Sequence, residues 1–377
     1  MSKCDKVKLS ELINQKTDTE QIVDMENEHY ITLSLYGKGA RERVIKDGKY
    51  PVPFTGYRVS EGQFIYSRID ARNGAYDIIG PELDGFVVSK DFPVFDINES
   101  KVLPHFLRRA VLSDAFINQV KNSSFGATNR MRIKEDIFAG YSIPLPELSK
   151  QKEIVDILDR VETIIDSRQQ ELQKLDDLIK ARFVEMFIAK DFPILTLDEV
   201  SLSKGEYGAQ SASIRYDPSR PRYVRITDIN DDGTLNNDVV SSANKEDDEQ
   251  YKLTYGDFMF ARMGATVGKT YAYKSGNQIF AGYLIRYKLD LGKIMPEYLY
   301  AYTKLDEYEN WVLLNQSGAA QPGINAKKYG SLKIPVPPIE VQRQFVGFCT
   351  KIDKSKLLEA RQAGFIAKTG RQISFCR

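Results

Sequence analysis

The run Gly264-Ala265-Thr266-Val267-Gly268-Lys269-Thr270 is the part of this sequence that most resembles a catalytic motif, the phosphate-binding P-loop. A P-loop places four residues between its two glycines, and a helix follows whose first N–H groups point at the phosphate. Here three residues separate the glycines, and Tyr271-Ala272-Tyr273 is typical of a strand. The run therefore argues against nucleotide hydrolysis. It predicts either a glycine-rich hairpin that presents Arg262 and Lys269 to a ligand or a plain structural turn.

Other catalytic motifs are missing from the sequence. The two histidines, His29 and His105, have no motif around them, and Cys4, Cys349 and Cys376 are too scattered for a disulfide framework or a zinc site. No Gly-x-Ser-x-Gly, His-Glu-x-x-His or Cys-x-x-Cys pattern occurs. The two loops with which a nucleotide methyltransferase holds its cofactor and its flipped base are also missing. We therefore expect a non-catalytic protein that binds no cofactor and no metal.

Basic and amide side chains that could contact DNA form the second set of chemical groups. The 53 Lys and Arg residues are balanced by 52 Asp and Glu residues, which argues against a lone, non-specific DNA binder. Local clusters can still contact phosphates, and Arg pairs with guanine and Asn or Gln with adenine in the major groove. Solvated loops would have the same composition, so both interpretations stay open. The candidates are Arg41, Arg43, Lys46, Arg68, Arg72, Asn73, Asn129, Arg130, Arg132, Arg215, Arg220, Arg222, Arg225, Arg262, Lys269, Gln321, Asn325 and Lys327.

The elements that would position these residues occur twice in the chain. Ile143-Pro144-Leu145-Pro146 is followed by Gln151, and 191 residues later Ile334-Pro335-Val336-Pro337 is followed by Gln342. Other anchors repeat as well: residues 57–68 match 251–262, and Leu103-Pro104 matches Met295-Pro296. Between the anchors the halves diverge, since residues 30–56 share little with 223–250. A repeat this long indicates a duplicated domain, because solenoid units run roughly 20–50 residues.

Each half combines short strands with helices, so the fold class we expect is α+β. Aromatic and branched runs such as Phe64-Ile65-Tyr66 and Phe258-Met259-Phe260 predict strands, and 104–120 and 296–314 predict helices that start at a proline. The predicted domains are 1–148 and 191–338, separated by a long-helix spacer at 149–190 and followed by a second one at 339–377. The sequence contains no run of about 18 apolar residues, so we expect no membrane span. The charged N-terminal residues and the few cysteines favour a location in the cytoplasm.

The spacer is a heptad-patterned helix. About 38 residues at 1.5 Å each give a rod of about 57 Å, and a helix of this length needs a partner for its apolar stripe. Antiparallel pairing with the second spacer, as a coiled coil, is the simplest arrangement. The pattern becomes irregular after Leu358, so the conformation of the C-terminal end stays open. The predicted seam consists of Ile154, Leu158, Val161, Ile165, Leu172, Leu175 and Ile179, together with Phe345 and Ile352.

The order and duplication of these motifs resemble the specificity subunit of type I restriction–modification systems. The resemblance covers essentially the whole chain and rests on the two Ile-Pro-x-Pro turns with their Gln, the Gly62-Gln63-Phe64-Ile65 and Gly256-Asp257-Phe258-Met259 runs, and the Ser-Gly-Ala loop at Ser317. The irregular C-terminal helix is where this sequence departs from the family pattern.

The resemblance implies two target-recognition domains, each of which reads one half of a split sequence in double-stranded DNA. It also implies that the long helices act as a ruler and that methylation subunits dock on them; we expect two such subunits. Restriction subunits would then join the complex. A rod of about 57 Å corresponds to about 17 base pairs at 3.4 Å each, long enough for two readers about one helical turn apart. The alternative is a coiled-coil interaction scaffold without sequence-specific DNA binding.

Overall fold

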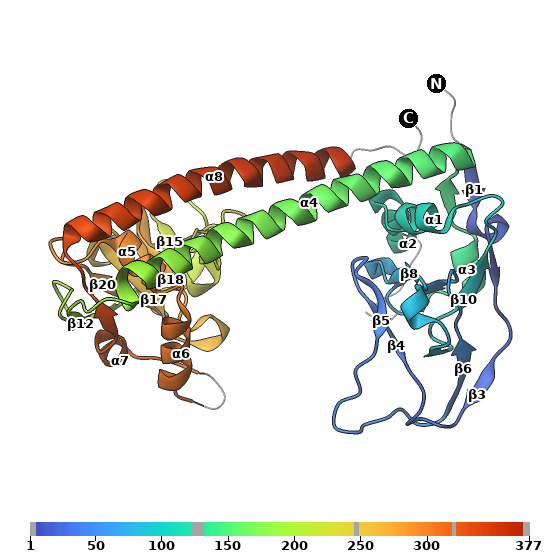
Figure 1. Ribbon diagram of the computed structural model, residues 1–377, viewed down its shortest axis with the longest axis horizontal. Helices are drawn as coiled ribbons and strands as arrows, with labels where there is room; N and C mark the ends of the chain where they lie inside the picture. Colours follow the sequence, from blue (N-terminus) through green and yellow to red (C-terminus); the bar gives the residue numbers. More distant parts are fainter. Residues whose placement is uncertain (1–4, 123–131, 245–248, 319–321, 372–377) are drawn as a thin grey trace. The chain divides into compact units, whose positions relative to one another are not determined.

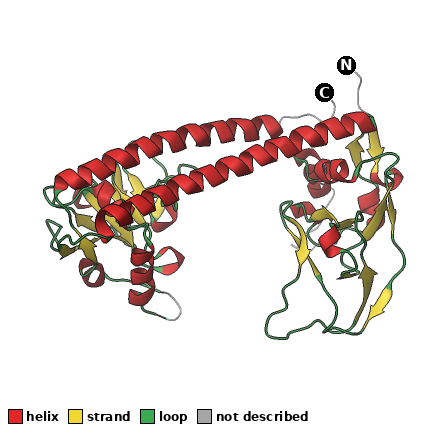
Figure 2. Cartoon of the chain, in the orientation of Figure 1, coloured by secondary structure: helices red, strands yellow, loops and turns green. Residues whose placement is uncertain are grey.

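The computed structural model describes residues 5–122, 132–244, 249–318 and 322–371, and for residues 360–371 it describes only the backbone. The chain divides into two compact units, residues 1–167 with 363–377 and residues 168–362. Figure 1 traces the elements along the chain, and Figure 2 shows that each unit contains both helices and strands. The predicted α+β composition is confirmed for both.

The scaffold of the first unit is an antiparallel sheet covered by short helices. Its strand order is β2-β10-β7-β8, and a separate antiparallel pair, β1 with β11, joins the start of the unit to its end. Large aromatic side chains such as Phe64, Phe95 and Phe138 pack between sheet and helices. The bounds are β1 Lys6–Lys8, β2 Ile13–Gln15, β7 Phe64–Tyr66, β8 Tyr76–Ile78, β10 Val94–Ile97, α1 Pro104–Val111, α2 Asp114–Asn122, α3 Glu135–Ala139 and β11 Ser142–Pro144, with a 3₁₀ turn at Leu9–Glu11.

The second unit repeats the strands and helices of this scaffold in the same order. Its sheet has the order β13-β20-β17-β18, the pair β12 with β21 joins its ends, and three helices follow in the same sequence. The predicted duplication is therefore visible as a repeated topology. The bounds are β12 Ile194–Thr196, β13 Glu206–Tyr207, β17 Asp257–Ala261, β18 Thr270–Ala272, β20 Leu284–Lys288, α5 Pro296–Tyr302, α6 Asp306–Asn315, α7 Ala326–Gly330 and β21 Lys333–Pro335.

The predicted helices at 104–120 and 296–314 are each split in two. Leu112 and Ser113 separate α1 from α2, and the segment Thr303–Leu305 separates α5 from α6. The break lets both short helices turn an apolar face to the core, which one straight helix could not do: Phe106 and Phe116 are both buried in the first unit, as are Tyr298 and Tyr308 in the second. The proline at the start of α1 and α5 lies in the first helical turn, as predicted.

The divergent segments form different structures in the two units. In the first unit they build the three-stranded sheet β3-β6-β9 and the two-stranded ribbon β4-β5; in the second they build the pairs β14-β16 and β15-β19, the latter parallel. The bounds are β3 Glu20–Ile22, β4 Ile31–Ser34, β5 Gly39–Glu42, β6 Phe54–Arg58, β9 Val87–Ser89, β14 Ser213–Arg215, β15 Arg222–Val224, β16 Ser241–Ala243 and β19 Gln278–Phe280.

The repeated glutamine joins each scaffold to its long helix. Gln151 is fully buried; its Oε1 accepts from the Leu103 N–H at 2.8 Å, and its Nε2 donates to the carbonyls of Lys101 and Pro146 at 2.9 and 2.8 Å. Gln342 is buried in the same way. It accepts from the Met295 N–H at 2.9 Å and donates to the carbonyls of Lys293 and Pro337 at 2.8 and 2.9 Å. A side-chain amide is needed because it offers an acceptor and two donors at one site.

The two long helices are α4, Leu148–Phe183, which continues as one π-helical turn at Val184–Ile188, and α8, Ile339–Arg371. The C-terminal end that the sequence left open is therefore helical to Arg371. Within the second unit the two helices run antiparallel, because residue numbers fall along α8 as they rise along α4 in successive contacts. These contacts are Arg168 with Glu359 at 2.8 Å, Asp176 with Lys356, and the Phe183 ring with the Phe345 ring at 5.3 Å between centroids.

The seam residues lie in three settings. Ile154 belongs to the core of the first unit with Leu158 packed against it, whereas Phe345 and Ile179 belong to the core of the second. Ile352 is buried. The middle of α4 keeps its apolar positions only half-buried; these are Val161, Ile165, Leu172 and Leu175.

Candidate nucleic-acid interface

The ribbon of the first unit, β4 with β5, has one apolar face and one polar face. Ile31 and Leu33 are buried in the unit's second core, whereas Thr32 and Ser34 alternate with them and are partly exposed. Arg41 lies opposite Thr32 in the antiparallel register, and its Nε donates to the Ser34 hydroxyl at 3.4 Å. Three candidates, Arg41, Arg43 and Lys46, are therefore exposed on or just beyond this ribbon.

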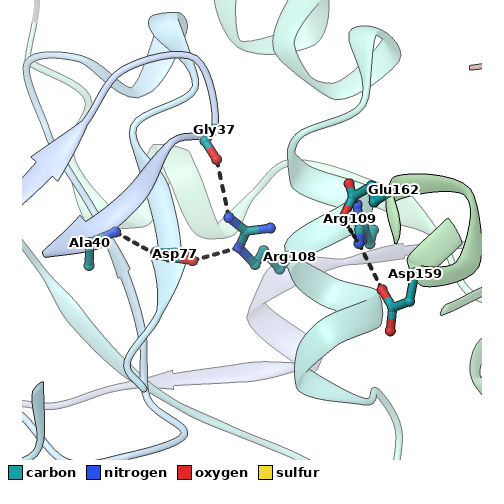
Figure 3. A network of polar contacts seen from close by, with 7 residues as sticks. All are labelled: Gly37, Ala40, Asp77, Arg108, Arg109, Asp159 and Glu162. Atoms are coloured by element: carbon teal, nitrogen blue, oxygen red, sulfur yellow. Dashed lines mark hydrogen bonds and ion pairs between the residues drawn. The ribbon is translucent and has the colours of Figure 1, made fainter. Parts of the chain in front are cut away.

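Polar contacts to the scaffold hold the ribbon in place (Figure 3). Asp77 on β8 accepts from the Ala40 N–H and from Arg108 Nε, both at 2.5 Å, and Arg108 Nη2 donates to the Gly37 carbonyl at 3.1 Å. Gly39 is required here because its φ is +84° and a Cβ would lie 2.5 Å from the Asp77 carboxylate. This clamp could not be recognised from the sequence, because Asp77 and Arg108 belong to no motif.

The next residue of α1 points to the spacer helix (Figure 3). Arg109 forms ion pairs with Asp159, at 2.8 Å, and with Glu162, both on α4. The Arg109 guanidinium holds the pKa of the Glu162 carboxyl below its usual value. Two adjacent arginines of one helix thus contact the ribbon and the spacer.

Several other candidates of the first unit have partners inside the fold. Arg68 pairs with Glu135, and Arg132 pairs with Asp91 at 3.0 Å. Asn73 donates to Asp70 at 3.4 Å in the 3₁₀ turn Ala71–Asn73, where Arg72 is half-buried. DNA contact by these side chains stays a prediction. To contact DNA, each side chain would have to release its partner within the protein or share it with the DNA. Asn129, Arg130 and Gln321 lie outside the described residues.

The basic cluster predicted around residues 215–225 is mostly internal to the second unit. Arg225 pairs with the buried Asp228 at 2.8 Å, and Arg222 donates to the Asn237 side chain at 2.7 Å and to the Asn236 carbonyl. Arg220 donates to the Ala243 carbonyl at 3.3 Å. Arg215, on β14, is exposed. These side chains brace the divergent segment, so a common basic face does not form here.

A second group of candidates meets at one edge of the sheet in the second unit. The Arg262 guanidinium stacks over the Tyr207 ring, 4.7 Å from its centroid. The Arg262 N–H donates to the carbonyl of Tyr283, a residue that is 58% exposed, and the Tyr207 hydroxyl accepts from the Ala326 N–H at 3.2 Å. We call Tyr207, Arg262 and Tyr283 the tyrosine–arginine edge. The tyrosines were missed because composition does not show which ring lies beside an arginine.

Two further candidates flank the tyrosine–arginine edge on α7. Asn325 caps this helix, since its Oδ1 accepts from the Lys328 N–H at 2.9 Å, and Lys327 is exposed in the first turn. Ile324 donates its N–H to the Arg262 carbonyl at 2.9 Å, so α7 lies next to the edge. Aromatic faces, an arginine and a lysine at one place suit contact with bases and phosphates.

Lys269 lies at the other end of the glycine-rich run and pairs with Asp231 at 2.6 Å. The ion pair lowers the pKa of Asp231. The run itself forms a 3₁₀ turn at Gly264–Thr266 and then β18, not a helix, which confirms that it is no P-loop. Its counterpart in the first unit, the 3₁₀ turn Ala71–Asn73, also joins two antiparallel strands. A hairpin is thus correct, but Arg262 and Lys269 contact different partners.

Neither metal-binding nor membrane-spanning features are found where the structure describes the chain. Among the described residues, no group of three or more His, Cys, Asp or Glu side chains could hold a metal ion. None of the described helices is both long and apolar enough to cross a membrane.

Sequence relatives are specificity subunits of type I restriction enzymes. The HindI subunit of Haemophilus influenzae is 28% identical over 162 residues, which are 41% of this chain and 35% of that protein. The StySPI subunit of Salmonella potsdam is 24% identical over 271 residues, 66% of this chain and 58% of that protein. The putative MjaX subunit of Methanocaldococcus jannaschii is 21% identical over 345 residues, 84% and 77% of the two chains. The chain thus spans about a third to somewhat over half of the first two relatives.

Solved structures share the fold. A chain from a study of complex assembly and conformational transition of a type I R-M system has a TM-score of 0.60 at 18% identity, covering 97% of this chain and 95% of that one. The type I S subunit from M. genitalium has a TM-score of 0.51 at 13% identity, covering 97% and 93%. The model of the type I restriction modification DNA specificity domain matches residues 1–177 and 195–363, one match for each repeat. The chain belongs to this family.

Proposed function

We propose that this chain is the non-catalytic DNA-recognition subunit of a type I restriction–modification complex, and that each unit reads one half of a bipartite target. The observation that carries the proposal is the repeated scaffold with different inserts. The sheets β2-β10-β7-β8 and β13-β20-β17-β18 have the same order, whereas the inserts form β3-β6-β9 and β4-β5 in the first unit and β14-β16 and β15-β19 in the second. Base contacts specify a sequence and phosphate contacts position the protein. A constant scaffold with divergent inserts can therefore read two unrelated half-sites.

The spacer helices suit a ruler. The 36 residues of α4 extend about 54 Å at 1.5 Å each. We infer that α4 and α8 pair as an antiparallel coiled coil, supported by the contacts of Arg168 with Glu359 and of Phe183 with Phe345. The proposed target-recognition domains are 1–148 and 191–338, with spacers at 149–190 and 339–377.

The exposed apolar side chains of the long helices support docking of methylation subunits. Ile157 and Ile164 are seven residues apart on α4 and Leu178 is two heptads further on; all three are at least 40% exposed. On α8, Leu357 and Leu358 are also exposed. Restriction subunits would join the same complex. Partners of this kind also explain how a chain with a net charge of only +1 can bind DNA.

Methylome sequencing tests the proposed function directly. Cells that carry the chain with its partner subunits should methylate a bipartite sequence that cells lacking only this chain leave unmethylated. An unchanged methylome, together with a gel shift that shows no preference among DNA sequences, would instead favour the coiled-coil interaction scaffold.

Matched insertions test the ruler. One heptad is inserted in α4 between Arg168 and Leu175, and a second in α8 between Lys356 and Glu359. Because both helices gain two whole turns, the Arg168–Glu359 and Phe183–Phe345 contacts stay in phase. The rod lengthens by about 10.5 Å, or about three base pairs, and the methylated sequence should keep both halves with a longer gap. Four-residue insertions at the same points rotate the apolar stripe and should reduce activity. An active complex with an unchanged gap after the heptad insertions would show that the helices are not a ruler.

A further inference from the structure

The two divergent segments have opposite charge. Residues 30–56 contain five basic and two acidic side chains, whereas residues 223–250 contain two basic and eight acidic ones. Phosphates attract the first segment and repel the second. If both units bind DNA, as the proposed function requires, the insert of the first unit carries the positive charge that suits it to face the duplex.

The shape of the first insert suits the major groove. The groove admits a two-stranded β-ribbon, and β4 with β5 is such a ribbon, joined by the register Thr32 to Arg41 and Ser34 to Gly39. Its apolar face is buried in the core, and on the opposite face Gly39 lies against Asp77. The part of that face available to a ligand is therefore the end that carries Thr32 and Arg41.

The tip of the ribbon is not free to enter the groove. The Tyr36 N–H donates to the Asn73 carbonyl at 2.7 Å, and the Gly37 N–H donates to the Gly74 carbonyl at 3.0 Å. Together with the Asp77–Arg108 clamp, which Figure 3 shows, these bonds fix the turn end of the ribbon on the scaffold. A reader held on a rigid support loses less entropy on binding and places its side chains more accurately.

We propose that the β4-β5 ribbon lies face-on in the major groove of the half-site read by the first unit, with Arg41 donating two hydrogen bonds to a guanine. Lys38, Arg43 and Lys46 contact the flanking phosphates. Arg41 is suited to the reading position because it is exposed at the available end of the polar face, and its hydrogen bond of 3.4 Å to Ser34 is long enough to be exchanged readily. This inference rests on the proposed function. It adds that the β4-β5 ribbon is the element that reads the first half-site and that guanine is the base read by Arg41.

Two substitutions at Arg41 separate base reading from simple charge attraction. The full chain is assembled with its methylation subunits, and binding is measured on the native target and on duplexes that change one base pair at a time. Arg41→Ala should lower discrimination at one G·C pair of one half-site by roughly five- to 150-fold and leave the other half-site unchanged. Arg41→Lys keeps the charge but loses the bidentate geometry, so it should lose discrimination at the same pair.

Lys101→Ala is the matched control, since it removes an exposed cation of the same unit away from the ribbon. It should leave discrimination at every base pair unchanged. If Arg41→Ala weakens binding equally at all base pairs while Arg41→Lys behaves as wild type, Arg41 contacts phosphate only and the inference is overturned. If neither substitution changes binding, it is overturned as well. A wild-type complex that discriminates no base pair would overturn the proposed function itself, so the two failures are distinguishable.

Discussion

Replacing either repeated glutamine should destabilise the unit to which it belongs. Gln151→Leu replaces the amide with an apolar side chain. It removes three hydrogen bonds of 2.8–2.9 Å and leaves the Leu103 N–H and the Lys101 and Pro146 carbonyls without that partner. Each buried group left unpaired costs about 1–3 kcal/mol, and the added apolar surface offsets part of this. We expect the free energy of unfolding of the first unit to fall by about 3–5 kcal/mol.

The second repeat provides a matched variant. Gln342→Leu removes the equivalent bonds to Met295, Lys293 and Pro337 and should destabilise the second unit by a similar amount. Gln151→Glu is a third probe of the same site. An ionised carboxylate still accepts from the Leu103 N–H but faces two carbonyl oxygens with no proton to donate, so we expect it to be at least as destabilising at neutral pH.

Urea denaturation combined with hydrogen exchange measures both effects. Exchange of the Leu103 amide should accelerate in Gln151→Leu, exchange of the Met295 amide should accelerate in Gln342→Leu, and each variant should leave the other amide unchanged. A loss of less than about 1 kcal/mol in both variants would refute the argument that these three bonds join scaffold to helix. Acceleration of both amides by one variant would show that the two units do not unfold separately.

Three further predictions concern recognition, catalysis and pH. Exchanging residues 1–148 for the first domain of another family member should change one half of the methylated sequence; a methylome in which both halves change, or neither, contradicts modular recognition. The purified chain alone should neither methylate nor cleave DNA, and transfer of a labelled methyl group by the chain alone would contradict this. Glu162→Gln should cost about 0.5 kcal/mol at neutral pH, because the Arg109–Glu162 pair is partly exposed. Since the folded pKa of Glu162 is lowered, this stability is present above the unfolded value of 4.5 and lost as pH falls through the folded pKa. In denaturation experiments, Glu162→Gln should be less stable than the wild type at neutral pH and equally stable at acidic pH. Glu99→Gln, at an exposed glutamate of the same unit, is the control and should match the wild type at both pH values.

The repeated scaffold could be predicted from the sequence because its anchors are under the same physical demand in both halves. Gln151 and Gln342 each contact two backbone groups of an earlier loop and one carbonyl of the Ile-Pro-x-Pro turn itself. Only an amide satisfies all three, because it offers one acceptor and two donors. The strand Phe64–Tyr66 and its counterpart are buried at every position, and such runs are recognisable without a structure.

The DNA-binding candidates could not be ranked from the sequence, because residue type does not show where an acidic partner lies. Arg68 pairs with Glu135, which is 67 residues away, and Arg132 pairs with Asp91, which is 41 residues away. Arg225 is different, since its partner Asp228 is three residues along and could have been recognised as local. The stacking of Arg262 on Tyr207 joins two strands that are not adjacent in sequence, and therefore needed the sheet order.

The adjacent arginines of α1 connect the ribbon to the spacer helix within the first unit. Arg108 holds the ribbon through Asp77 and Gly37, and Arg109 holds α4 through Asp159 and Glu162, so the orientation of the ribbon is fixed relative to the first turns of the spacer. A domain exchanged at residue 148 brings its own ribbon and clamp but leaves Asp159 and Glu162 with the recipient. A donor domain without a basic residue at the position of Arg109 would leave two acidic side chains without that partner. Such a domain should still read its own half-site, but it should be held less firmly on α4. Under the proposed function, we expect a change at the ribbon to alter which bases are read and a change at Arg109 to alter how precisely the gap is measured.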